Sequence, residues 1–324
     1  MVTRTITMTA AGSTDSSARP APRLAHIDTD PGLDDALALL FGWNSPELAV
    51  VGVTTVAGNV GVEAATTNLL RLLAARAPKP PPEIGMGAGA PLGRRRLVTA
   101  TDYHGGDGLG DQLDWPPVDI GTVRRDGVQL LVETARRHGP ALTLIALGPL
   151  TNLALALAAD PATIRAVGRL VVMGGAVDVP GNVTADAEFN IHVDPEAARS
   201  IFVSGLMVDL VPLDATRRAA LTRPRLAGAL ADTADALAER VARFTERGFT
   251  VEAATGVPTM FLHDPLAVAV AFHDFVRWEP ARVEVGAAGE TRRVAGRPNC
   301  RVAHLVDPDA FIELFLSRLC RASS

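Results

Sequence analysis

Four carboxylates fall within eight residues of this chain, Asp28-Thr29-Asp30-Pro31-Gly32-Leu33-Asp34-Asp35. The apolar run at residues 24–29 predicts a buried strand, and the apolar run at residues 33–42 predicts a helix that begins just after Pro31-Gly32. The acidic motif therefore lies where a strand gives way to a helix. In a parallel sheet this junction is the carboxyl edge, which is where ligands bind.

The alternation of strand and helix patterns continues towards the C-terminus. Further strands are predicted at residues 48–54, 142–147, 170–173 and 207–212, and helices at residues 62–75, 150–159 and 308–321. Because strands that alternate with helices of this length form parallel sheets, we expect an α/β fold: a single domain with a mostly parallel central sheet flanked by helices. Two long loops without their own structure are expected at residues 85–117 and 176–189, which is typical of lids or binding loops.

The composition of the 324 residues excludes several classes of function. With 31 basic and 36 acidic side chains and a net charge of −5, nothing favours nucleic acid or an anionic membrane as a partner. The only lysine, Lys79, lies between prolines, so neither a P-loop nor Schiff-base chemistry is available. No apolar run reaches the roughly 18 residues that span a bilayer.

The two ends of the chain indicate its organisation and location. Residues 1–22 are rich in threonine, serine, alanine and proline and lack the apolar core of a secretory signal, so we expect a disordered N-terminal tail and a folded domain at residues 23–324. The two cysteines, Cys300 and Cys320, are too few for a disulfide framework and lack zinc-ligand spacing. These features favour a reducing, cytoplasmic location.

The acidic motif itself suggests a metal site. Strand alternation places Asp28 and Asp30 on one side of the strand, while Asp34 and Asp35 fall in the first helical turn. Carboxylates this close raise one another's pKa unless a cation is present, and all-oxygen ligation favours Ca²⁺ or Mg²⁺ over zinc. An acidic helix start would explain Asp34 and Asp35 alone, but not two aspartates on an apolar strand.

Other polar residues follow the ends of predicted strands. They are Asn59, Asn152, Met173-Gly174-Gly175 and His263-Asp264-Pro265, the last of which opens a late apolar helix. Each alone could be a turn residue or a helix cap. Together they place polar groups at the same sheet edge as the acidic motif, and this convergence favours one site.

Three functions fit an acidic, metal-bearing sheet edge. The first is hydrolysis of a neutral substrate by a metal-activated water that an aspartate deprotonates. The second is a metal-dependent aspartate phosphatase, because Asp28-Thr29-Asp30 resembles the start of the haloacid-dehalogenase pattern; the lysine that such enzymes use on phosphate is missing here. The third is a sugar-binding module, without catalysis, that uses the ion only to hold vicinal hydroxyls.

With Asn59, Met173-Gly174-Gly175, Glu188-Phe189-Asn190 and His263-Asp264-Pro265 in order, the acidic motif resembles that of the inosine–uridine-preferring nucleoside hydrolases. The resemblance runs from about residue 24 to the C-terminus. It implies a Rossmann-like nucleoside hydrolase domain that cleaves the N-glycosidic bond of purine or pyrimidine ribonucleosides and releases free base and ribose. It also implies a homodimer or homotetramer.

The resemblance further implies a role for each site residue. One Ca²⁺ per subunit would bind the carboxylates of Asp30, Asp35 and Asp264 and the backbone carbonyl of Leu147, with Asp28 supporting them from behind. Asp30 would be the general base for a water that inverts the anomeric carbon, and His263 the general acid for the leaving base. Substrate contacts would come from Asp34, Asn59, Met173, Asn182, Glu188, Asn190 and His104.

Two of these roles have an alternative from the residues alone. His263 could be a packed histidine that fixes the following turn, and His104 could be an exposed residue of its glycine-rich loop rather than a group that reaches the base. The base end of the site is otherwise nearly blank, because residues 243–262 offer only three phenylalanines and the sole tyrosine is Tyr103. The choice between purine and pyrimidine therefore stays open.

Overall fold

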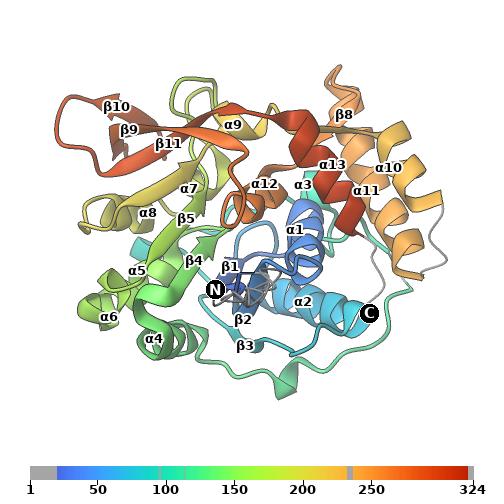
Figure 1. Cartoon of the computed structure of the whole chain (residues 1–324), viewed down its shortest axis with the longest axis horizontal. Coiled ribbons are helices and arrows are strands. Elements are labelled where there is room, and N and C mark those ends of the chain that lie inside the picture. The colour runs from blue at the N-terminus through green and yellow to red at the C-terminus, as the bar shows by residue number, and fades with distance from the viewer. Residues whose placement is uncertain (1–19, 95, 113, 232–235, 320–324) are drawn as a thin grey trace, which may run out of the picture.

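Figure 1 shows the computed structural model of the chain, which describes residues 20–94, 96–112, 114–231 and 236–319. One nine-stranded sheet runs through the molecule in the order β10-β9-β11-β6-β5-β4-β1-β2-β3. Its strands are β1 (Arg23–Thr29), β2 (Leu48–Thr55), β3 (Glu83–Met86), β4 (Leu142–Ala146), β5 (Arg169–Met173), β6 (Val208–Val211), β9 (Val276–Val285), β10 (Thr291–Val294) and β11 (Cys300–Val306). Every neighbouring pair from β3 to β11 is parallel, whereas β9 pairs antiparallel with both β10 and β11.

Helices cover both faces of this sheet (Figure 1). They are α1 (Leu33–Trp43), α2 (Val62–Arg76), α3 (Thr101–His104), α4 (Gly127–His138), α5 (Thr151–Ala159), α6 (Pro161–Arg165), α7 (Phe189–Val193), α8 (Pro195–Phe202), α9 (Leu213–Thr216), α10 (Arg223–Ala231), α11 (Ala236–Ala254), α12 (His263–Ala269) and α13 (Pro308–Leu319). The strands β7 (Ala220–Thr222) and β8 (Thr259–Phe261) form a separate antiparallel pair, and β8 ends just before α12 begins in the sequence.

Strand alternation divides the apolar residues between two cores. On β5, Val171 and Met173 pack into the core that contains α1, α12 and α13, whereas Leu170 and Val172 pack into the core that contains α5 and α8. The strands are buried on both faces because parallel connections place a helix over each side. This burial leaves the carboxyl edge of the sheet as the place where polar side chains gather.

Most of the predicted elements are confirmed, and the mostly parallel sheet with them. The loop predicted at residues 85–117 is wrong in part, because it contains the short helix α3 as well as a 3-10 turn, Leu92–Arg94. The predicted tail at residues 1–22 lies outside the described residues apart from 20–22, which precede β1. None of the helices in the described ranges is long and apolar enough to cross a membrane.

Phe41 on α1 is the centre of an aromatic cluster in the core that contains α1, α12 and α13. Its ring lies 5.7 Å from that of Phe272, 6.4 Å from Phe311 and 5.5 Å from Phe315, and the side chain is fully buried. The cluster joins the helix that carries Asp34 and Asp35 to α13 at the end of the chain.

We expect Phe41→Ala to lower the free energy of unfolding by about 3–5 kcal/mol, because it removes buried surface and leaves a cavity. Chemical denaturation followed by circular dichroism measures this. Leu305→Ala, at a leucine that is 54% exposed, is the matched control and should change stability by less than about 0.5 kcal/mol. Equal losses in both variants would contradict the assignment of this cluster.

Candidate active site

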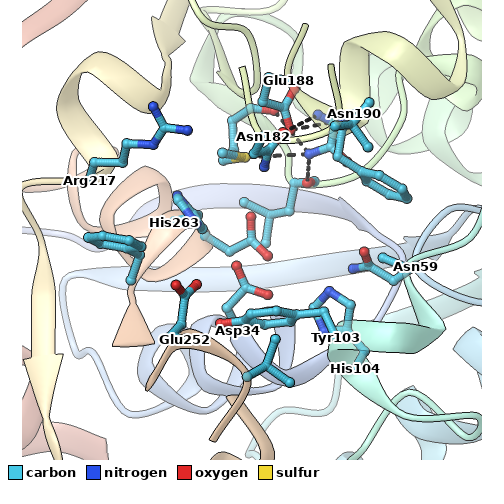
Figure 2. Close-up of a pocket in the computed structure, with 18 of the residues that line it drawn as sticks. Asp34, Asn59, Tyr103, His104, Asn182, Glu188, Asn190, Arg217, Glu252 and His263 are labelled. Atoms are coloured by element: carbon cyan, nitrogen blue, oxygen red, sulfur yellow. Dashed lines mark hydrogen bonds between the residues drawn. The ribbon is translucent and has the colours of Figure 1, made fainter. Parts of the chain in front are cut away.

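A pocket of about 350 Å³ opens at the carboxyl edge of the sheet. Its lining comes from the ends of β4 and β5, from α1, α3, α7, α11 and α12, from the loop after β2 and from the loop before α7. Figure 2 shows Asn182, Glu188 and Asn190 along one wall and Asp34 opposite them, with Asn59 and His104 at one end and His263 and Arg217 at the other. The structure thus brings together side chains as far apart in the sequence as Asp34 and Asp264.

Asp35 is the best-held carboxylate of the acidic motif. Its two oxygens accept hydrogen bonds from the hydroxyl of Thr29 (2.5 Å), the backbone N–H of Gly32 (3.0 Å) and the side-chain amide of Asn59 (2.9 Å). The Gly32 contact is also a cap for the first turn of α1. One side chain therefore joins the strand, the helix start and the loop after β2.

Asp30 sits in a space that only glycines leave open. A Cβ on Gly58 would lie 2.1 Å from one Asp30 oxygen, and a Cβ on Gly148 would lie 2.4 Å from the other. The backbone N–H of Asn59 donates to Oδ2 of Asp30 at 2.6 Å, while Oδ1 is buried and has no hydrogen-bond partner among the described residues. Asp30 thus has one fixed oxygen and one that is available to a ligand.

A hard cation fits this cluster. The carboxylates of Asp34, Asp35 and Asp264 offer oxygens that all lie within 4.8 Å of one another, and Oδ1 of Asp264 is buried without a partner in the described chain. Burial, followed by repulsion from the neighbouring carboxylates, raises the pKa of Asp34 to about 8 and places the pKa of Asp30 and Asp264 well above the usual range. Groups in this condition ionise readily only beside a positive charge.

Asp28 lies behind the cluster rather than in the pocket. Its Oδ1 accepts hydrogen bonds from the hydroxyl of Thr54 (2.5 Å) and from the amide of Asn152 (2.8 Å), and burial raises its pKa to about 7. Asn152 also donates to the backbone carbonyl of Thr55. Asn152, which follows the end of a predicted strand, therefore connects α5 to β1 and β2 through these hydrogen bonds.

Glu188, Asn190 and Asn182 line the pocket from the loop before α7 and from α7 itself. Glu188 is buried and caps this helix, accepting hydrogen bonds from the backbone N–H groups of Asn190 (2.8 Å) and Gly175 (2.9 Å). The amide of Asn190 donates to the carbonyl of Leu147 at 2.6 Å and approaches Met173 at 3.4 Å. The oxygen of Asn182 accepts the backbone N–H of Phe189.

Both candidate histidines face the pocket. His104 is only 6% exposed, and its Nδ1 accepts the backbone N–H of Leu33 at 3.0 Å, so an exposed loop histidine is wrong for this position. Nδ1 of His263 lies 2.6 Å from the hydroxyl of Thr216. Burial lowers the pKa of His104 to about 3, and burial together with the charge of Arg217 lowers the pKa of His263 to about 4. Both rings are therefore neutral near pH 7.

Sequence patterns do not single out Tyr103, Arg217 or Glu252 as site residues, although all three line the pocket. Arg217, just after α9, donates to the carbonyls of Pro180 and Gly181; its position soon after a predicted strand end was an available signal. Glu252 on α11 neighbours the hydroxyl of Tyr103, and both line the pocket. Nothing in the spacing of the sequence pairs these two residues, because a helix and a loop far apart along the chain bring them together.

The fold matches those of solved enzymes. The structure is similar to that of a plant nucleoside hydrolase, with a TM-score of 0.84, 31% identity and coverage of 92% of this chain and 99% of that one. It is equally similar to a purine-preferring ribonucleoside hydrolase from Gardnerella vaginalis, with a TM-score of 0.84, 29% identity and coverage of 92% and 98%. Together they define the class: this protein is a ribonucleoside hydrolase.

Sequence comparison narrows this class to a family. The family model described as inosine-uridine preferring nucleoside hydrolase matches residues 25–313. The chain is 34% identical to a probable uridine nucleosidase 2 of Arabidopsis thaliana over 90% of this chain and 96% of the relative. It is also 34% identical to a pyrimidine-specific ribonucleoside hydrolase of Klebsiella pneumoniae, over 90% and 97%. The chain belongs to the inosine-uridine preferring nucleoside hydrolase family, which confirms the resemblance, the fold class and the enzyme class.

The raised pKa of Asp34 predicts how stability depends on pH. Between its unfolded value near 3.8 and its folded value of about 8, the folded state holds the extra proton, so the free energy of unfolding falls as pH rises. The lowered pKa values of the histidines act only below about pH 6.5, where unfolded histidine becomes protonated. Cation-free protein should therefore lose about 2 kcal/mol between pH 6.5 and 8.5.

Thermal unfolding at these two pH values, with and without added Ca²⁺, measures this effect. Ca²⁺ should reduce the loss, because a cation favours the ionised carboxylates. Asp34→Asn should reduce the pH dependence, although the other buried aspartates still contribute to it, whereas Asp274→Asn, at an exposed aspartate, should leave it as in the wild type. A cation-free protein that gains stability from pH 6.5 to 8.5 would contradict the site electrostatics.

Proposed function

We propose that this protein hydrolyses the N-glycosidic bond of ribonucleosides in a Ca²⁺-dependent reaction that releases free base and ribose, with Asp30 as the general base. The observation that carries the proposal is the state of Asp30. Its carboxylate lies between two glycines with one oxygen fixed by the Asn59 N–H and the other free, beside a cluster of three further aspartates.

The pocket has one wall suited to a ribose. Asp34 is a hydrogen-bond acceptor and Asn190 presents an amide, and we assign these two to the 2′- and 3′-hydroxyls. Asn182 and Glu188 lie on the same wall as Asn190 and are assigned to the 5′-hydroxyl. Met173 also lines the pocket and is assigned a contact with the substrate. Both oxygens of Glu188 already accept backbone N–H groups, so its contact with the substrate would use the remaining lone pair.

We assign one Ca²⁺ per subunit to Asp30, Asp35, Asp264 and the carbonyl of Leu147. In the structure the close carboxylates are those of Asp34, Asp35 and Asp264, so we also assign Asp34 a place within reach of both the cation and the sugar. When bound, the ion would supply the positive charge that keeps these aspartates ionised and that orients substrate hydroxyls and water. Asn190 would move its hydrogen bond from the Leu147 carbonyl to the substrate when that carbonyl becomes a ligand.

The chemistry of the chain's own groups follows from their protonation. Burial and the neighbouring carboxylates raise the pKa of Asp30, so a bound cation would be needed to keep it ionised; in that form its carboxylate can take a proton from water. Asn59 would position the groups that surround this water. Attack from the face opposite the base, with no covalent intermediate, inverts the anomeric carbon. His263 would give a hydrogen to the leaving base, and His104 could contact the base from the α3 side.

We also propose a homodimer or homotetramer in the cytoplasm. The resemblance to the family supports the oligomer, and the buried, unpaired Cys300 is typical of a reducing compartment. The nucleoside hydrolase relatives favour catalysis over the ribose-binding module and over the phosphatase. Relatives of both pyrimidine and purine type are similar to this chain, so a panel of nucleosides is the decisive assay.

The first test is release of free ribose from uridine, cytidine, inosine, adenosine and guanosine by the Ca²⁺-loaded protein. We expect turnover of at least one nucleoside. Asp30→Asn should lower kcat by at least about 100-fold with little change in circular dichroism, because it removes the base but keeps the shape. Ribose affinity without release of base would instead establish the binding module.

Two controls make this assay specific. Asp119→Asn changes an exposed aspartate that caps the 3-10 turn Ile120–Thr122, outside the pocket, and should retain wild-type turnover. A chelator should abolish activity, and added Ca²⁺ should restore it. Activity that survives both the chelator and Asp30→Asn would overturn the proposed chemistry.

The second test concerns the leaving group. We expect His263→Ala to slow hydrolysis of the best nucleoside by about 10²–10³-fold, because the hydrogen-bond donor that stabilises charge on the leaving base is lost. p-Nitrophenyl riboside, whose leaving group needs no proton, should be slowed far less. Equal slowing of the two substrates in steady-state kinetics would remove His263 from this role.

A further inference from the structure

Thr216 is a buried polar residue that the proposed reaction leaves unexplained. It is the last residue of α9, and its side chain is fully buried. Its hydroxyl lies 2.6 Å from Nδ1 of His263. It does not line the pocket, so it touches neither substrate nor ion directly.

The surroundings of Thr216 fix the direction of this hydrogen bond. In a ring with one hydrogen, either the hydroxyl donates to Nδ1 or an Nδ1–H donates to the hydroxyl. In the second arrangement the hydroxyl hydrogen would need another acceptor, and the described residues offer it none. A buried donor without an acceptor is costly, whereas an oxygen with spare lone pairs is tolerated. The hydroxyl therefore donates to Nδ1.

This direction determines which nitrogen of His263 carries hydrogen. With Nδ1 accepting from Thr216, the ring hydrogen is on Nε2, and Figure 2 shows the ring of His263 pointing into the pocket. We propose that Thr216 is a positioning residue that holds His263 in the Nε2–H tautomer, so that the ring presents a hydrogen-bond donor to the leaving base. The inference rests on the proposed role of His263 in nucleoside hydrolysis.

The backbone keeps the two residues in register. The N–H of Thr216 donates to the carbonyl of Pro212 at 3.0 Å, and the N–H of Leu262 donates to the carbonyl of Ala219 at 2.9 Å. The residues that follow pair as strands, with Ala220 opposite Phe261. The segment that follows α9 and the segment that precedes α12 are thus joined directly beside the Thr216–His263 contact.

Two charged side chains, one on α9 and one just after it, also hold the loop that precedes α7. The carboxylate of Asp214 accepts the backbone N–H groups of Val177 and Asp178 at 3.0 and 2.8 Å. Arg217 donates to the carbonyls of Pro180 and Gly181. A hydroxyl on an element held in this way fixes the ring it contacts more firmly than one on a free loop.

Kinetics with two leaving groups tests this inference. Thr216→Val keeps the size and removes the hydroxyl; Thr216→Ser keeps the hydroxyl. We expect Thr216→Val to lower the ratio of kcat/KM for the best nucleoside to kcat/KM for p-nitrophenyl riboside by at least about tenfold. Thr216→Ser should restore this ratio to within about threefold. Thr134→Val, which removes a buried hydroxyl that bonds Leu130 on α4, is the matched control and should leave it unchanged.

The background of His263→Ala isolates the pair. Once His263 is absent, adding Thr216→Val should have no further effect on the ratio, because the hydroxyl then has no ring to orient. A ratio that Thr216→Val leaves unchanged, or that falls further in the double variant, would overturn the inference. So would equal slowing of the two substrates by Thr216→Val, which is the signature of a merely structural role.

Long-range ¹H–¹⁵N correlation spectra of histidine-labelled, Ca²⁺-loaded protein give a readout that does not depend on turnover. The spectrum of His263→Ala identifies the signals of His263. We expect the Nε2–H pattern in the wild type and in Thr216→Ser, and its loss in Thr216→Val; an Nδ1–H pattern in the wild type would overturn the inference. A protein with the Nε2–H pattern that releases no ribose would contradict the proposed function and leave the tautomer assignment standing.

Discussion

The structure depends on the burial of several carboxylates at the end of one strand. Moving an ionised carboxylate out of water costs several kcal/mol unless it is paired or hydrogen-bonded. Asp35 receives hydrogen bonds on both oxygens, whereas Asp28, Asp30 and Asp264 each keep an oxygen without a partner in the described chain. Asp28 lies behind the cluster, where its other oxygen is held by Thr54 and Asn152. The acidic edge is therefore divided into carboxylates that hold the scaffold and carboxylates that are left for a ligand.

The scaffold around this edge is built to keep the unpartnered oxygens open. Glycines at positions 58 and 148 leave the space that Asp30 occupies, and a methyl group at either would strike its carboxylate. Glu188 organises the opposite wall by capping α7, and the short helix α9 holds both the loop before it and the ring of His263. Such preorganisation is what lets polar groups act on a substrate without first rearranging.

Much of the fold could be predicted, because strand and helix periods are local properties. The strand at Arg23–Thr29 and the helix at Leu33–Trp43 were expected within a residue or two. The short helix α3 was missed, since four residues give too few turns for a periodic signal. This helix places Tyr103 and His104 against the pocket. The sequence did not favour a pocket position for His104 over an exposed position in its loop.

The amino-acid sequence alone determined the acidic motif, its place at a strand end and the family that it resembles, because these depend on residue type and spacing along a short stretch. Tertiary structure decided which carboxylate oxygens have partners, since Thr54 comes from β2, Asn59 from the loop after it and Asn152 from α5. It also decided that Thr216, Arg217 and Glu252 stand beside the site. Hydrogen bonds and burial depend on distances across the sheet edge, and no local pattern encodes those distances.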